Sequence, residues 1–286
     1  MKVVERVTDA RAELAVGRQA GWDIGLVPTM GSLHDGHLSL AERAVSDCEF
    51  TVMTIFVNPL QFGEGEDLDA YPRDLDADLN MAELAGVDLV FVPSVEEMYP
   101  EPPATIVRVD ELAAELEAAS RPTHFQGVAT VVAKLFNIAG PCRAYFGEKD
   151  YQQLVIVRRM ASDLSFPVQV VGCPIVREDD GLAMSSRNAY LDPTERKAAT
   201  VLHRALRVGV EAIESGQRSP EAVEAAMADV VAAEPLAELD YAVVRRGRDL
   251  AVIDPLSGEI RLLGAVRLGR PRLIDSLGAH VAPSAD

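Results

Sequence analysis

The sequence has no apolar stretch long enough to cross a membrane. Its longest apolar runs have the length of a strand, such as residues 51–57, whereas a membrane helix needs about 20 consecutive apolar residues. The N-terminal segment mixes charged and apolar residues and lacks the apolar block, followed by small residues, that marks a secretory signal. We therefore predict a cytoplasmic protein with no membrane partner.

Cysteine is also scarce. The three cysteines, Cys48, Cys142 and Cys173, are widely spaced and form no CxxC pair. This pattern favours free thiols in a reducing compartment over a disulfide framework or a zinc site.

Basic residues are few relative to acidic ones. The chain has 27 Lys and Arg against 45 Asp and Glu, a net charge of −18. An acidic surface repels a phosphate backbone, so a nucleic-acid partner is disfavoured. A small phosphate-bearing ligand is not excluded, because a local cluster of His, Lys and Arg can still form a positive pocket.

The length of 286 residues is enough for one large domain or two ordinary ones, and hydrophobic residues, at 48% of the chain, can form a sizeable core. In the first part of the chain, short apolar runs alternate with segments of helical spacing, which is typical of a doubly wound, Rossmann-like α/β parallel sheet. We expect strands at 24–27, 50–57, 88–92, 105–109, 143–146 and 168–172, and helices at 37–48, 71–84, 127–139 and 151–162.

The pattern changes after residue 180. Residues 193–215 predict one long amphipathic helix and residues 220–233 another. Strand-like runs follow at 239–244, 251–253 and 261–268, and indicate a smaller α+β domain with an antiparallel sheet. We place the boundary at residues 175–181, giving domains of 1–176 and 177–286.

The first chemical motif, PTMGSLHDGH at residues 28–37, follows the first expected strand and opens the first helix. A helix N-terminus presents unpaired N–H groups to a phosphate, and Gly31 and Gly36 permit close backbone approach. His34 and His37 can donate hydrogen bonds to a leaving phosphate group. In isolation the two histidines would more simply be polar loop residues, and a metal site is weaker still because no HExxH pattern is present.

Three further motifs stand at expected strand ends or at the domain junction. Residues 56–62, FVNPLQF, offer amides, although Asn-Pro is also a common turn opener. Residues 146–154, FGEKDYQQL, place a lysine between a strand and a helix, where it suits phosphate, although EKD is also a common solvated cluster. Residues 177–188, REDDGLAMSSRN, place two hydroxyls and a guanidinium in sequence as a phosphate clasp, although a serine there can also be a helix N-cap.

The HxGH sequence resembles the nucleotidyltransferase superfamily, which includes class I tRNA synthetases. The four motifs together are similar to the pantothenate synthetase family, as is YPR at residues 71–73 with Asp78. A fifth segment, RPTHFQGV at residues 121–128, has Thr123 where that family usually has glycine. His124 is not assigned a catalytic role, and Arg121 either contacts a carboxylate or fixes its loop.

The resemblance implies that ATP activates the carboxylate of pantoate as an acyl-adenylate, which then condenses with β-alanine. It also implies Mg²⁺ with ATP, and a homodimer. The catalytic residues it implies are His37, His34 and Lys149. The ATP-binding residues it implies are Met30, Gly31, His34, His37, Gly147, Lys149, Asp150, Val176, Met184, Ser185, Ser186 and Arg187. The substrate-binding residues it implies are Gln61, Gln153, Asn58 and Thr29, with Asp78 as the metal ligand.

Two other functions stay open from the sequence. One is an HxGH adenylyltransferase that acts on a phosphate-bearing acceptor, and the other is a module that binds nucleotide without turnover. A tRNA synthetase fragment is disfavoured by the charge and by the absence of an anticodon-binding module. For His37, a role as proton donor and a role in charge stabilisation are equally compatible with the motif.

Overall fold

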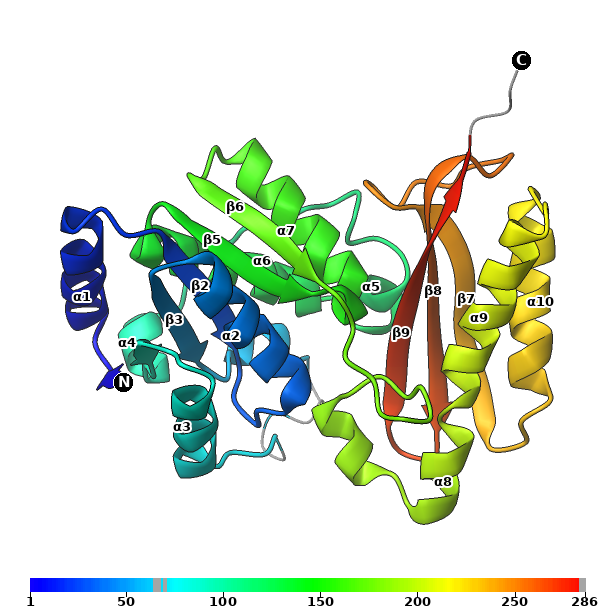
Figure 1. Cartoon of the computed structure of the whole chain (residues 1–286), viewed down its shortest axis with the longest axis horizontal. Coiled ribbons are helices and arrows are strands. Elements are labelled where there is room, and N and C mark those ends of the chain that lie inside the picture. The colour runs from blue at the N-terminus through cyan, green and yellow to red at the C-terminus, as the bar shows by residue number, and fades with distance from the viewer. Residues whose placement is uncertain (64–67, 69–70, 283–286) are drawn as a thin grey trace. The chain divides into compact units, whose positions relative to one another are not determined.

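The computed structural model describes residues 1–63, 68 and 71–282 (Figure 1). The chain divides into two compact units. The first comprises Met1–Gly147 and Gln152–Pro174, and the second comprises Glu148–Tyr151 and the chain from Ile175 onward. The boundary expected after residue 176 lies two residues beyond Pro174. The short segment Glu148–Tyr151 groups with the second unit although its neighbours in sequence belong to the first.

A parallel sheet forms the centre of the first unit. Within the described residues it contains six strands: β1 (Lys2–Val4), β2 (Ile24–Thr29), β3 (Phe50–Ile55), β4 (Leu89–Phe91), β5 (Cys142–Gly147) and β6 (Val168–Cys173). Their order is β1-β4-β3-β2-β5-β6, and all pairs are parallel. The order reverses at β2, which lies between β3 and β5. The doubly wound fold predicted from sequence is confirmed, and ligands of such sheets bind at the carboxyl ends beside this reversal.

Helices cover both faces of this sheet, and in Figure 1 α2 lies directly in front of β2. One face is packed by α2 and α3, and the other by α1 and α6, as right-handed crossovers require. The helical segments of this part of the chain are α1 (Val7–Gln19), α2 (Asp35–Asp47), η1 (Pro59–Gln61), α3 (Leu75–Leu84), α4 (Val95–Met98), α5 (Glu117–Ser120), α6 (His124–Ala139), η2 (Glu148–Asp150) and α7 (Tyr151–Asp163).

Side-chain caps set where several of these helices begin. The imidazole of His34 caps α2, Asp74 caps α3 and Ser94 caps α4, each accepting a hydrogen bond from a backbone N–H of the first turn. Such caps satisfy donors that have no partner inside the helix. The cap at Asp74 explains why α3 starts at Leu75, later than the helix predicted from residue 71.

The second unit consists of an antiparallel sheet with helices on one face. Its described strands are β7 (Ala237–Arg246), β8 (Gly258–Leu268) and β9 (Arg272–Val281), paired in the order β7-β8-β9. Its helical segments are η3 (Ser186–Tyr190), α8 (Pro193–Ala198), α9 (Val201–Glu214) and α10 (Pro220–Ala232).

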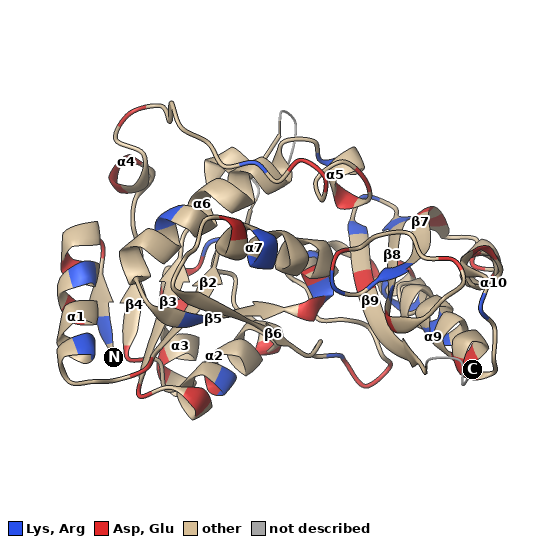
Figure 2. Ribbon diagram, turned by 90° about the horizontal axis from the view of Figure 1, so that it is seen from above, with Lys and Arg blue, Asp and Glu red and all other residues tan. Residues whose placement is uncertain are grey.

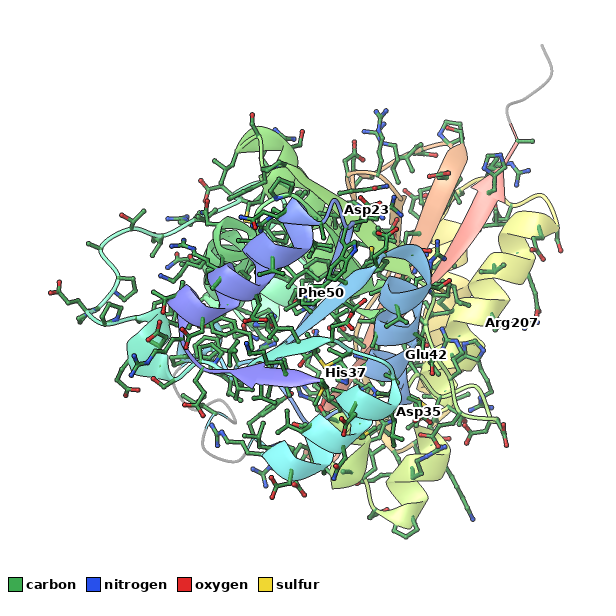
Figure 3. All side chains as sticks on the ribbon, turned by 60° about the vertical axis from the view of Figure 1, so that its left-hand side comes forward. Asp23, Asp35, His37, Glu42, Phe50 and Arg207 are labelled. Carbon is green, nitrogen blue, oxygen red and sulfur yellow. The ribbon has the colours of Figure 1, made fainter. Side chains whose placement is uncertain are left out.

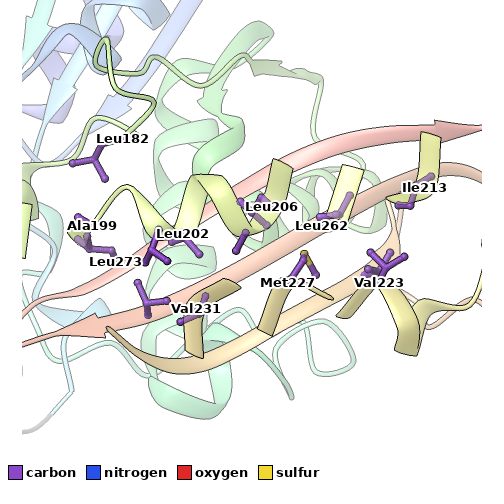
Figure 4. Packing of buried hydrophobic residues seen from close by; sticks show 14 of the residues in the cluster. Leu182, Ala199, Leu202, Leu206, Ile213, Val223, Met227, Val231, Leu262 and Leu273 are labelled. Atoms are coloured by element: carbon purple, nitrogen blue, oxygen red, sulfur yellow. The ribbon is translucent and has the colours of Figure 1, made fainter. Parts of the chain in front are cut away.

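The core of the second unit lies between the sheet and the pair α9 and α10. Figure 4 shows Leu202 and Leu206 of α9 facing Leu262 and Met227 across this layer. Gly209 lets α9 pack closely against β8, because a Cβ at this position would lie 2.5 Å from the side chain of Leu262. The smaller α+β domain expected from sequence is therefore confirmed.

The predicted strand at residues 105–109 is wrong. This segment has no regular secondary structure. The backbone N–H of Val107 donates to Thr130 Oγ1 of α6 at 3.0 Å, so the segment is held by a helix side chain and not by a neighbouring strand. Two prolines, Pro102 and Pro103, precede it and restrict its approach to a sheet.

Two predictions in the second unit are also wrong. The expected helix at 193–215 is two helices, α8 and α9, separated by a turn at Ala199 and Thr200, where Thr200 Oγ1 donates to the carbonyl of Lys197, a contact of the kind that bends helices. The expected strand at 251–253 is irregular. Leu250 before it has φ +58°, which turns the chain out of the extended path, and the third strand of the sheet is β9.

Charged residues are distributed along the chain. Figure 2 shows acidic positions recurring from α1 to α10, with basic positions interspersed. Among the described residues, no helix combines the length and the apolar character that a membrane span requires.

Candidate functional site

The turn between β2 and α2 is held by Asp78 of α3. Both carboxylate oxygens of Asp78 accept hydrogen bonds from the turn, from Ser32 N at 2.9 Å and from Leu33 N at 2.8 Å. Gly31 has φ +80°, and a Cβ there would lie 2.7 Å from Asp78 Oδ2. Glycine is therefore required at this position both by its backbone conformation and by the carboxylate.

Thr29 ties the same turn to the sheet. Its hydroxyl donates to the carbonyl of Thr54 on β3 at 2.7 Å and accepts from Gly31 N at 3.2 Å. The side chain is buried. The observed contacts of Thr29 are thus structural, and its predicted contact with substrate stays a prediction.

The two histidines of the HxGH motif lie together at the first turn of α2. Their ring centroids are 4.1 Å apart, and Figure 3 shows Asp35 and His37 at the start of the helix, with Glu42 further along. His34 Nδ1 accepts the backbone N–H of Gly36 at 3.1 Å. An accepting Nδ1 requires the neutral tautomer with its proton on Nε2, so His34 can donate a hydrogen bond through Nε2. The helix N-terminus adds the positive end of its dipole.

A cluster of neutral amides follows β3. Asn58 is 1% exposed and Gln61 is 7% exposed, and Asn58 Nδ2 donates to Gln61 Oε1 at 3.1 Å. Gln61 Nε2 donates to Met30 Sδ at 2.8 Å. The structure therefore brings together three predicted site residues from two separate motifs, residues 28–37 and residues 56–62.

The backbones of η1 and α6 pack closely beside this amide cluster. A Cβ at Gly127 of α6 would lie 2.2 Å from the carbonyl oxygen of Leu60, far inside van der Waals contact. Only glycine lets α6 approach η1 this closely. The carbonyl of Gly127 also accepts from Asn58 Nδ2 at 3.1 Å.

The segment RPTHF anchors the backbone of the same cluster. Arg121 Nη2 donates to the carbonyl of Gln61 at 3.3 Å, and His124 Nδ1 lies 3.0 Å from the same oxygen. Of the two roles that the sequence left open for Arg121, the fixing of the loop is thus observed. Thr123 has φ −97°, a conformation open to every residue, so the glycine usual in the family is not needed there.

The two adjacent glutamines at the start of α7 differ. Gln152 is buried and holds the preceding loop, because its Nε2 donates to the carbonyls of Leu112 and Glu115 and its Oε1 accepts from Glu117 N. Gln153 is half-buried. Gln153 is thus the more accessible of the pair, and its predicted role in substrate binding stays a prediction.

In the second unit, Lys149 and Ser185 line the same small pocket, together with Asn188, His203 and Asp275. The side chain of Lys149 is 17% exposed and lies 3.6 Å from Asp150 Oδ2. Lys149 is thus largely buried although it pairs with the half-exposed Asp150 of the EKD segment, and its predicted contact with phosphate stays a prediction.

Ser185, Ser186 and Arg187 directly follow a turn formed by residues 176–184. Met184 N donates to the carbonyl of Val176 at 3.0 Å, and the backbones of Arg177 and Ala183 form an isolated antiparallel β-bridge. Ser185 caps η3, since its Oγ accepts from Arg187 N at 3.3 Å. The N-cap role considered from sequence is therefore present.

A buried ion pair fixes this turn to the antiparallel sheet. Arg177 makes a bidentate contact with Asp275 of β9, at 2.7 and 2.9 Å, and donates to the carbonyl of Gly181 at 3.0 Å. The side chain of Asp275 is 3% exposed. Arg196 supports the same turn through ion pairs with Glu178 and Asp180, and Arg196 holds the pKa of the Asp180 carboxyl below its usual value.

The segment that carries Lys149 is fixed to the same sheet. Arg261 of β8 donates to Glu148 Oε2 at 3.0 Å and stacks on the Tyr151 ring at 4.0 Å. Ser276 Oγ donates to the carbonyl of Glu148 at 2.7 Å. These contacts explain why residues 148–151 group with the second unit.

His203 lies against the ion pair, with Nδ1 at 3.9 Å from Asp275 Oδ2. Burial, together with the nearby Arg177 charge, lowers the pKa of His203. None of the three cysteines forms a disulfide, Cys173 is buried and the other two are half-buried, and burial raises the pKa of Cys142 to about 12.

Among residues 1–63, 68 and 71–282, no group of three or more His, Cys, Asp or Glu side chains is placed to hold a metal ion. Both oxygens of Asp78 already accept backbone hydrogen bonds. Mg²⁺ usually keeps several waters and is bound through one or two carboxylates and substrate phosphates, so a cluster of protein ligands is not expected for it. The assignment of Asp78 as its ligand stays a prediction.

Several residues of these clusters were not found from sequence. Tyr99 donates to Asn58 Oδ1 at 3.0 Å, and Asp275 and Arg261 stabilise the second unit. Each pairs with a residue at least 41 positions away in sequence, so no local motif contains them. Gly127 was visible in its motif, but its steric role depends on η1.

Comparisons with known proteins agree with this arrangement. The family model described as pantoate-beta-alanine ligase matches residues 2–278. The pantothenate synthetase of Roseiflexus castenholzii is 52% identical over 96% of this chain and 98% of its own, and that of Heliobacterium modesticaldum is 51% identical over 98% of this chain and 100% of its own.

Solved structures lead to the same family. The pantothenate synthetase of Thermus thermophilus has a TM-score of 0.93 at 50% identity, over 98% of this chain and 100% of its own. The ligase of Francisella tularensis, described as complexed with beta-gamma ATP and beta-alanine, has a TM-score of 0.78 at 31% identity, over 97% of both chains. The chain therefore belongs to the pantoate–β-alanine ligase family.

Proposed function

We propose that this protein joins pantoate to β-alanine at the expense of ATP, and releases AMP and pyrophosphate. The observation that carries this proposal is the family match over residues 2–278. Two features that follow the neighbouring strands β3 and β2 support it. They are the amide cluster around Gln61 and the turn at His34, which leads into the N-terminus of α2.

In the first step, a carboxylate oxygen of pantoate attacks the α-phosphorus of ATP. The bond between the α-phosphorus and the bridging oxygen breaks, and pyrophosphate leaves with the electron pair. We propose that His34 and His37 donate hydrogen bonds to phosphate oxygens, because they lie at the N-terminus of α2. Lys149 adds a positive charge, and such stabilisation is worth most where charge develops in the transition state.

The remaining predicted nucleotide contacts come from the same segments. Met30 and Gly31 belong to the turn before α2, and Gly147 and Asp150 flank Lys149. Val176, Met184, Ser185, Ser186 and Arg187 belong to the turn that Arg177 fixes. We propose that hydroxyl and guanidinium groups of this turn bind phosphate oxygens.

In the second step, the amine of β-alanine attacks the acyl carbon of the pantoyl-adenylate. The C–N bond forms as the bond between the acyl carbon and the phosphate oxygen breaks, AMP leaves with that electron pair, and the amine proton passes to solvent. We propose that Gln61 and Gln153 bind pantoate, with Asn58 and Thr29 beside them. His37 acts as proton donor or stabilises charge, and no covalent bond to the enzyme is required.

We also propose that Mg²⁺ enters with ATP and neutralises phosphate charge. We propose a cytoplasmic location, since cysteines that form no disulfide are typical of a reducing compartment. A homodimer is proposed from the family resemblance alone.

AMP formation from ATP and pantoate, with and without β-alanine, tests this function. We expect sustained AMP release only when all three substrates are present, with pantothenate formed in equal amount. AMP release that requires a phosphate-bearing acceptor would identify a different adenylyltransferase. If neither AMP nor pyrophosphate forms, the result would favour the alternative that the protein binds nucleotide without turnover.

Two variants test the assignment of the site within the same assay. We expect His37→Ala and Lys149→Ala each to lower kcat by about 100-fold or more, the usual cost of removing a group that stabilises transition-state charge. The matched controls are His280→Ala and Lys197→Ala, because both side chains are exposed and are expected to leave kcat within about twofold. Equal losses in variants and controls would contradict these roles.

A further inference from the structure

Asn58 has all its hydrogen-bonding positions occupied by the protein. Its Oδ1 accepts from Leu60 N at 3.3 Å and from Tyr99 Oη at 3.0 Å. Its Nδ2 donates to Gln61 Oε1 and to the carbonyl of Gly127, each at 3.1 Å. A side-chain amide offers two donors and two acceptor lone pairs, so nothing is left for a substrate.

The bond from Asn58 fixes which end of Gln61 is available. Because Gln61 Oε1 accepts from Asn58, the amide is oriented with Nε2 on the other side, where it meets Met30 Sδ. A thioether sulfur is a weak acceptor and occupies one of the two N–H groups. The orientation therefore presents Gln61 as a donor, which suits a carboxylate or hydroxyl oxygen of the substrate.

We propose that Asn58 and Tyr99 are positioning residues for pantoate: the Tyr99 hydroxyl fixes the Asn58 amide, which holds Gln61 with its N–H groups toward the substrate oxygens. This inference rests on the proposed binding of pantoate by Gln61. It replaces the direct contact expected for Asn58 with an indirect role, and it adds a residue that none of the sequence motifs contains.

The surroundings of Tyr99 keep its hydroxyl a donor. Tyrosine is protonated at physiological pH at its ordinary pKa of about 10, and burial raises the pKa of Tyr99 further, to about 12. Its ring packs against Phe56, with centroids 6.2 Å apart, and the ammonium of Lys134 lies 5.3 Å from the ring centroid. The ring is thereby held from two directions, and its hydroxyl stays directed at Asn58.

Substitution of Tyr99 by Phe is the first test. The ring contacts remain while the hydroxyl is lost, so Asn58 Oδ1 keeps the hydrogen bond from Leu60 N and loses the one from Tyr99. We expect the KM for pantoate to rise about three- to tenfold, the range for loss of one neutral hydrogen bond, while the KM for ATP stays within about twofold. An unchanged KM for pantoate, or an equal rise in both KM values, would overturn the proposal.

A double-mutant cycle with Gln61→Ala separates an indirect from a direct role. If Tyr99 acts through Gln61, adding Y99F to Q61A should change the KM for pantoate by less than about twofold. Effects that multiply in the double variant would show that Tyr99 acts independently of Gln61, against the proposal.

Asn58→Asp is the second variant. An aspartate still accepts from Tyr99 and Leu60 N, but it cannot donate to Gln61 Oε1. We therefore expect a larger rise in the KM for pantoate than in Y99F, and a KM as low as that of the parent would contradict the proposal.

The matched control is Tyr145→Phe. Tyr145 is a buried tyrosine of the same unit whose hydroxyl donates to Asp47 at 3.1 Å, outside the amide cluster. We expect the KM for pantoate to stay within about twofold in this variant, even if its thermal midpoint falls. A rise equal to that of Y99F would assign the effect to general loss of packing. Failure of the parent enzyme to form AMP from pantoate would instead refute the proposed function, so the two failures are distinguishable.

Discussion

The amide cluster of the first unit and the turn after Val176 in the second unit are held by different kinds of interaction. In the first unit, neutral amides and close backbone contacts position Asn58, Gln61 and the η1 segment. In the second unit, buried charges position the turn that carries Ser185, through Arg177 and Asp275. Buried neutral amides need only well-aligned hydrogen-bond partners. A buried charge also needs a group of opposite charge, because leaving it alone is strongly destabilising.

The difference matches the proposed ligands. Pantoate offers hydroxyls and a single carboxylate, so a site of oriented amides can distinguish donors from acceptors. The phosphates of ATP carry several negative charges, so a basic site must keep its own carboxylates engaged elsewhere. Asp275 and Glu148 are engaged in this way by Arg177 and Arg261.

The largest effect is expected from removal of one partner of the buried pair. Asp275→Ala leaves the Arg177 charge without its partner, which costs about 3–5 kcal/mol in such pairs. The control Asp163→Ala removes an exposed partner of Arg159, for which about 0–1 kcal/mol is expected. Urea denaturation followed by circular dichroism measures both, and equal losses would show that charge burial does not stabilise the second unit.

A steric change in the first unit comes next. In Gly127→Ala, the new Cβ meets the carbonyl of Leu60 at 2.2 Å, so we expect a loss of about 1–3 kcal/mol and a higher KM for pantoate as η1 moves. Gly147→Ala is the control for stability, since no atom lies within 4 Å of its added Cβ. A stable G127A protein with unchanged KM would show that η1 tolerates displacement.

Asp78→Asn distinguishes the observed contacts of this residue from its predicted metal role. An asparagine can accept from only one of the two turn N–H groups, so we expect a loss of about 1–3 kcal/mol. Asp76→Asn, on the exposed face of the same helix, is the control. A shift in the Mg²⁺ concentration needed for activity, without loss of stability, would instead support Asp78 as a metal ligand.

The smallest effect concerns pH and the second unit. The folded-state pKa of His203 is lowered, chiefly by burial, so the unfolded state binds the proton more readily. Stability is therefore complete above the ordinary histidine pKa of about 6.5 and declines as pH falls below it. We expect His203→Gln to show a weaker decline between about pH 7 and 5 in urea denaturation, while His280→Gln matches the parent; identical curves for all three would exclude His203.

Local patterns were enough to predict much of this protein. The strand, glycine turn and capped helix around His34 lie within a short stretch of chain, so their geometry follows from neighbouring residues. The β2, β3, β5 and β6 segments were likewise predicted from β-branched and apolar runs. The strands expected at 105–109 and 251–253 failed because Thr130 and the φ of Leu250 decide those paths, and neither is evident from apolar content.

The sequence by itself determined the α/β class, the second α+β unit and the family, because these depend on periodicity and on motifs whose residues are adjacent. Only the tertiary structure decided that Asn58 is fully satisfied by Tyr99, Gln61, Leu60 and Gly127, and that Asp275 fixes the turn after Val176. Tyr99 lies 41 residues from Asn58, and Asp275 lies 98 residues from Arg177. Contacts over such separations depend on how sheets and helices pack, which no local pattern of residues specifies.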